Sequence, residues 1–104
     1  MAWLYLFSAG ILEVVWAFTM KQSDGFSRPG PTAITIVTMI GSFALLSLAM
    51  RSLPLGTAYT IWTGIGAVGA FVVGILVLGE AATPMRILAA TLIVGGLVLM
   101  KAST

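Results

Sequence analysis

The sequence predicts an all-α membrane protein, with four transmembrane helices in a single domain over residues 1–104. The chain is 60% hydrophobic and only 8% charged, and its mean hydropathy is +1.13. A soluble domain carries about a quarter charged residues, so this chain has too little polar surface to be soluble. It contains four apolar runs of about 20 residues, the length of helix that crosses a hydrocarbon layer about 30 Å thick.

The first two spans are bounded by charged residues and turns. Residues 2–20 form the first span, which Lys21 and the turn at 23–25 follow, and residues 31–50 form the second, which ends before Arg51. Neither run shows the alternation of period two that a membrane β-strand requires, so helices are expected.

The last two spans have similar limits. Residues 57–78 form the third span, which ends before Glu80, and residues 84–100 form the fourth. Thr83 is the expected N-cap of the fourth helix, and Pro84 suits the first helical position because its missing N–H needs no partner there.

Composition excludes several classes of function. The chain has no Cys and no His, so disulfides, thiol or imidazole catalysis and the usual zinc sites are not expected. Its five Lys and Arg residues are scattered over loops and ends, which disfavours nucleic-acid binding. We therefore expect neither an enzyme nor a bound metal or cofactor.

The positive charges give little orientation signal. Arg51 and Lys101 lie on the side of the two termini, and Lys21, Arg28 and Arg86 lie on the other. Lys and Arg in loops set the orientation of a membrane protein. A balance as even as this one therefore predicts insertion in both orientations and an antiparallel pair of chains. The alternative is that the N-terminal helix or another factor fixes one orientation.

Glu13 is the one acidic residue inside a span. A charged group facing lipid costs at least about 2.5 to 3.5 kcal/mol, so its side chain must face protein or a watery cavity. Proton relay or cation binding is the predicted role, and a protonated carboxyl bonded to a nearby backbone is the alternative. Gly10, Trp16 and Ala17 share its helix face at spacings of three and four residues.

Two other spans carry polar or aromatic groups that suit such a site. Tyr59 and Trp62 share one face of the third span, where they either pack or attract a cation next to a carboxylate. Ser42 is a hydroxyl donor in the second span, with back-bonding to its own helix as the alternative.

Glycines suggest one bend and one contact surface. Gly64, Gly66 and Gly69 predict a bend in the third helix, and Gly95 and Gly96 predict a flat dimerisation surface on the fourth.

The combined pattern resembles the small multidrug resistance family over the whole chain. The segments Glu-Val-Val-Trp-Ala at 13–17 and Trp-Thr-Gly-Ile-Gly-Ala-Val-Gly-Ala at 62–70 are similar to those of its guanidinium-exporter subtype. The resemblance implies an antiparallel homodimer in the bacterial inner membrane, with two Glu13 carboxylates in one central site that exchange guanidinium for protons. It also implies a binding shell consisting of Gly10, Trp16, Ser42, Tyr59 and Trp62.

Other functions remain open at this stage. Within the family, a multidrug exporter of quaternary ammonium or polyaromatic cations is the main alternative, although the crowded face beside Trp16 disfavours bulky substrates. Outside it, a rotary proteolipid-type subunit usually carries its acid in a later helix of a hairpin. A passive channel would conduct without proton exchange, and an assembly factor would have no reason to bury Glu13.

Overall fold

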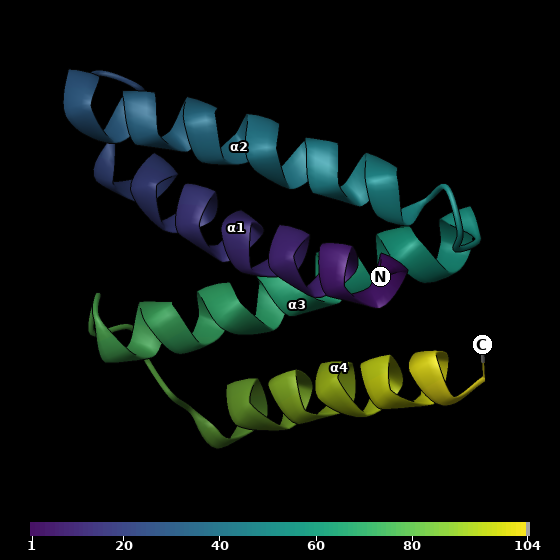
Figure 1. Cartoon of the computed structure of the whole chain (residues 1–104). Coiled ribbons are helices and arrows are strands. Elements are labelled where there is room, and N and C mark those ends of the chain that lie inside the picture. Colours follow the sequence, from purple (N-terminus) through teal and green to yellow (C-terminus); the bar gives the residue numbers. More distant parts are fainter. Residues whose placement is uncertain (104) are drawn as a thin grey trace.

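A computed structural model describes residues 1–103, which form four α-helices (Figure 1). Their bounds are Ala2–Gln22 for α1, Pro29–Ala49 for α2, Leu55–Leu76 for α3 and Pro84–Ala102 for α4. All four are long and apolar enough to cross a membrane. The prediction of four apolar transmembrane helices is therefore confirmed, and each helix begins and ends within two residues of its predicted span.

The N-termini of the helices follow their local sequence. α2 begins at Pro29, before the predicted start at residue 31, because Arg28 has an extended backbone and proline fits the first turn. α4 begins as predicted, with the Thr83 side chain accepting a hydrogen bond of 3.2 Å from the backbone N–H of Arg86.

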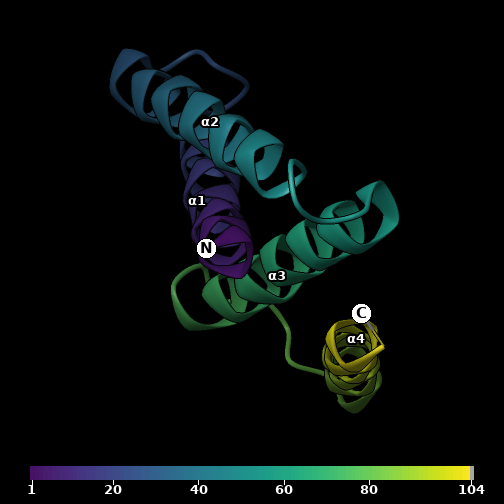
Figure 2. The same ribbon diagram turned by 45° about the vertical axis from the view of Figure 1, so that its right-hand side comes forward.

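Three of the helices pack closely and the fourth lies to one side. α1 and α2 form an antiparallel pair, α3 crosses α1, and α4 packs against α3 at the edge of the molecule (Figures 1 and 2). Both termini lie at the same end, together with the loop between α2 and α3. The other two loops lie at the opposite end.

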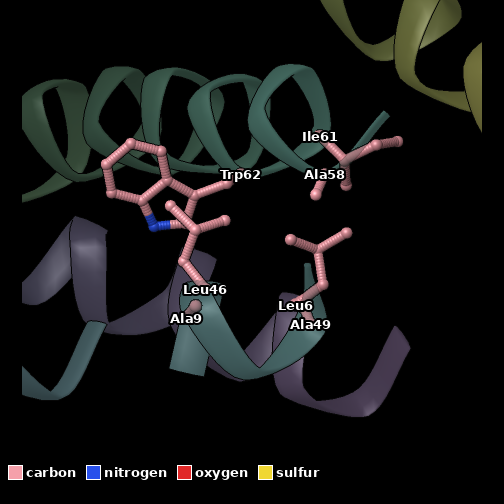
Figure 3. Packing of buried hydrophobic residues seen from close by; sticks show 7 residues of the cluster. All are labelled: Leu6, Ala9, Leu46, Ala49, Ala58, Ile61 and Trp62. Carbon is pink, nitrogen blue, oxygen red and sulfur yellow. The ribbon is translucent and has the colours of Figure 1, made fainter. Parts of the chain in front are cut away.

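The core joins α1, α2 and α3 and contains many small residues (Figure 3). Its buried apolar side chains are Leu6, Ala9, Leu46, Ala49, Ala58, Ile61 and Trp62. Lipid chains are as apolar as leucine, so helices in a membrane associate mainly by close packing, which small side chains permit.

Gly10 shows how tight the α1–α3 contact is. A Cβ added at Gly10 would lie 2.6 Å from Ile65 Cγ2 and 2.8 Å from Ile65 Cβ. Rotation of the isoleucine side chain cannot move its own Cβ away, so the two helices would have to separate. Glycine at this position therefore sets the distance between α1 and α3.

α4 has a different environment. None of its residues is buried, and large apolar side chains such as Leu92 and Leu99 are exposed along it. Its packing against α3 includes Leu97, which lies directly on Gly64. The outward faces of α4 are thus available to lipid or to another protein chain.

Gly10→Ala should destabilise the protein by about 1 to 3 kcal/mol, because the new methyl group overpacks the α1–α3 contact. Gly56→Ala, in the first turn of α3, is the matched control: its Cβ would meet nothing within 4 Å, and alanine favours the helix. Unfolding in SDS, followed by far-UV circular dichroism, measures both variants. A Gly10→Ala protein as stable as the unsubstituted chain would contradict this account of the contact.

Candidate functional site

Glu13 lies where α1 crosses α3. Its carboxyl group rests directly against Gly66, so that a Cβ added there would collide with Glu13 Cδ and Oε1. Oε1 is buried, and among the described residues it has no hydrogen-bond partner. Oε1 therefore makes no hydrogen bond to a nearby backbone group of the described chain. An unpartnered buried acceptor costs about 1 to 3 kcal/mol, so a donor from outside the described chain would stabilise it.

Trp16 presents a second unpartnered group, one turn further along α1. Its indole Nε1 is buried and has no hydrogen-bond acceptor among the described residues. The same helix face thus carries an acceptor at Glu13 and a donor at Trp16, neither satisfied within the described chain. Both can be satisfied by a ligand, by water or by a second copy of the chain.

Ser42 connects three helices. Its Oγ donates to the backbone carbonyl of Ala9 in α1 at 2.7 Å and accepts from Trp62 Nε1 in α3 at 3.0 Å. All three residues are buried. The hydroxyl therefore bonds across the bundle instead of back to its own helix, and it fixes the orientation of the Trp62 ring.

Four aromatic rings form a continuous row on one side of the bundle. Trp16 contacts Phe43 with ring centroids 6.3 Å apart, Phe43 contacts Trp62 at 5.8 Å, and Trp62 contacts Tyr59 at 5.6 Å. Tyr59, 53% exposed, is at the open end of the row, whereas Trp62 is only 7% exposed. Aromatic faces attract cations, so the row provides a suitable wall beside a carboxyl group.

Sequence reasoning missed Phe43. It lies in α2 between the two tryptophans and joins the aromatic group of α1 to that of α3. Its position directly after Ser42 was the available signal, but adjacent residues on a helix point in directions about 100° apart. Only the packing of α2 against α1 and α3 brings this ring into the row.

The predicted glycine sites fall into two groups. Gly66 and Gly69 accept side chains of α1, because an added Cβ would collide with Glu13 and Val14 respectively. α3 is an uninterrupted α-helix through Gly64, Gly66 and Gly69, and the functional bend there stays a prediction. Gly95 and Gly96 face open space, with nothing within 4 Å of an added Cβ.

The arrangement suits a cation better than a neutral or anionic ligand. A carboxyl oxygen without a donor and a row of aromatic faces both attract positive charge. No three side chains of His, Cys, Asp or Glu gather among residues 1–103 in a way that could hold a metal ion.

Four apolar helices, the first of which carries an acid in its apolar run, define the class, a small multi-pass membrane protein. The chain belongs to the family described as Small Multidrug Resistance protein, which it matches over residues 1–93. It is 58% identical over 104 residues to the guanidinium exporters of Citrobacter freundii and Salmonella typhimurium, and 57% identical to that of Escherichia coli K12. The alignments cover 100% of this chain and 99% of each relative. These names describe transporters, not enzymes.

Ser42→Ala should lower the free energy of unfolding by about 1 to 3 kcal/mol. The substitution leaves the buried Trp62 N–H without an acceptor and removes the hydrogen bond that the Ala9 carbonyl accepts from Ser42. Ser47→Ala, an exposed serine on the same helix, should have little effect. SDS unfolding gives the stability, and near-UV circular dichroism reports the Trp62 environment. Equal midpoints for the two variants would show that the buried bridge contributes nothing.

Proposed function

We propose that the protein is a proton-coupled antiporter that exports guanidinium and small guanidinyl cations across the bacterial inner membrane. Full-length relatives that are 57–58% identical are named guanidinium exporters, which supports the substrate. The observation that carries the mechanism is the buried, unpartnered Oε1 of Glu13 against Gly66.

Guanidinium fits this site chemically. It is planar, it remains charged near neutral pH, and its parallel N–H groups can donate two hydrogen bonds to one carboxylate. Its flat faces can also stack on tryptophan or tyrosine rings. The proposed binding shell is Gly10, Trp16, Ser42, Tyr59 and Trp62 around Glu13, and Phe43 adds a ring between the two tryptophans.

The working unit that we propose is an antiparallel homodimer. α4 has no buried residue, and Gly95 and Gly96 are open on its surface, so it can pack closely against a second chain. The nearly even balance of loop charges favours the opposite orientation for that second chain. Two Glu13 carboxyl groups would then line one site, each able to meet polar groups of the partner.

Substrate and protons compete for these carboxyl groups in the proposed cycle. Guanidinium binds when they are ionised, and protons displace it on the other side of the membrane. The occupied or protonated dimer exchanges its two inverted conformations, for which the glycines of α3 would provide a bend. If both acids take a proton, two positive charges exchange for one and transport is electrogenic. The two acids then titrate as one coupled pair.

Glu13→Gln should reduce proton-driven guanidinium uptake in liposomes to the level of protein-free vesicles, because an amide neither ionises nor releases a proton. Glu80→Gln makes the same chemical change at an exposed loop residue and should leave uptake close to that of the unsubstituted protein. Radiolabelled guanidinium and an imposed pH gradient give the rates. Coupled uptake by Glu13→Gln would remove Glu13 from the centre of the mechanism.

The purified protein should give transport currents on a solid-supported membrane with guanidinium, and much smaller currents with a bulky aromatic cation. The reason is that Phe43 and the two tryptophans close one side of the proposed site. The Phe43 ring centroid lies 6.3 Å from that of Trp16 and 5.8 Å from that of Trp62. The Glu13→Gln protein supplies the background current for each cation. Current with the aromatic cation alone would favour the multidrug alternative.

A further inference from the structure

An apolar groove of about 360 Å³ separates the C-terminal half of α4 from the rest of the bundle. Its lining includes Phe7 of α1, Ile61 and Ile65 of α3, and Val98 of α4. Phe7, Lys101 and Ala102 of its lining belong to the terminal parts of α1 and α4, and both termini lie at the same end of the molecule (Figure 1). A second, larger groove is lined by Tyr59 and Gly96. Leu97 lines both grooves.

Lys101 supplies the only charged group among the residues that line this groove. Its ammonium nitrogen lies over the indole ring of Trp3, 4.7 Å from the centroid, and Trp3 in turn contacts Phe7 at 6.2 Å. Tryptophan and lysine near helix ends are typical of the boundary between headgroups and hydrocarbon. The groove thus has a cationic, aromatic mouth at the boundary and an apolar interior below it.

The charges at this end are of one sign among the described side chains. Lys101 and Arg51 lie here, whereas the two loop acids, Asp24 and Glu80, lie in the loops at the opposite end (Figure 1). No carboxylate side chain of residues 1–103 therefore competes for Lys101 at this end. For the same reason, no acidic side chain of residues 1–103 repels an anion at this end.

We propose that this groove binds one anionic phospholipid, with part of an acyl chain along Phe7, Ile61 and Val98 and the headgroup phosphate on Lys101. The apolar interior suits a hydrocarbon chain, and the mouth suits a phosphate. A helix from a second chain is the competing occupant, and a cysteine variant distinguishes it from a lipid. This site is independent of Glu13 and does not rest on the proposed transport activity.

Native mass spectrometry of the purified full chain tests the proposal. The protein is incubated with equal amounts of phosphatidylglycerol and phosphatidylcholine that have the same acyl chains. The unsubstituted protein should retain one phosphatidylglycerol per chain in preference to phosphatidylcholine. Lys101→Gln should lower that preference about fivefold, the value of one lysine near an anionic surface, while Lys101→Arg should keep it.

Arg86→Gln is the matched control, because it removes one positive charge at the other end of the same helix, where the guanidinium lies 5.2 Å from the Phe71 centroid. It should leave the preference unchanged. Val98→Phe should reduce retention of both lipids, since it fills a groove wall that is 65% exposed.

Three results would overturn the proposal. One is equal loss of preference in the Lys101→Gln and Arg86→Gln proteins. Another is displacement of the lipid by free glycerol phosphate, which would indicate an anion site that needs no acyl chain. The third is efficient disulfide formation between copies of Val98→Cys that added phosphatidylglycerol does not reduce, which would show that a second chain, and not a lipid, occupies the groove; the sequence has no native cysteine to interfere.

Discussion

The close crossing of α1 over α3, at which the Glu13 carboxyl group lies against Gly66, is the contact on which the rest of the structure depends. A carboxyl group inside a bilayer has no bulk water to solvate it, so the protein must hold it in a defined place. Gly66 makes room for it, and Gly10 and Gly69 allow the two backbones to approach on either side. The acid is positioned by shape, and its oxygen Oε1 is left free of a partner within the described chain.

Packing and polarity are separated along α1. Leu6 and Ala9 belong to the core that joins the three central helices, and the Ala9 carbonyl also receives the Ser42 hydroxyl. Further along the same helix, Glu13 and Trp16 keep one unsatisfied polar atom each. The half of α1 with Leu6 and Ala9 thus holds the three helices together. The half with Glu13 and Trp16 is where a cation, water or a second chain can lower the free energy by satisfying a polar atom.

α4 has no buried residue in the single chain, so its outward side chains can contact lipid or a second chain. Contact with α3 through Leu97 leaves a groove on each side of that residue. One groove opens next to Gly96, on the face suited to a second chain, and the other has Lys101 at its mouth. The same helix can thus serve a protein contact and a lipid contact, because its outward residues are not needed to build the core.

The sequence by itself determined the number of helices, their limits to within two residues and the family, and it predicted Glu13 as the site residue. These properties depend on composition, span length and local motifs, which are read directly along the chain. Glu13 stands out because any ionisable residue in an apolar run requires a reason. Thr83 and Pro84 fix the start of α4 through contacts within a single turn.

Only the tertiary structure decided what each side chain meets. The sequence left the partner of Ser42 open until α1 and α3 were placed around it. The place of Phe43 beside Ser42 was too weak a signal, because its ring neighbours come from two other helices. The sequence predicted a bend at Gly66, which stays a prediction, and only the fold shows that this glycine also accepts the Glu13 carboxyl group. The physical reason is the same in each case: helix periodicity defines which residues share a face, but the face that lies opposite is set by how the helices cross.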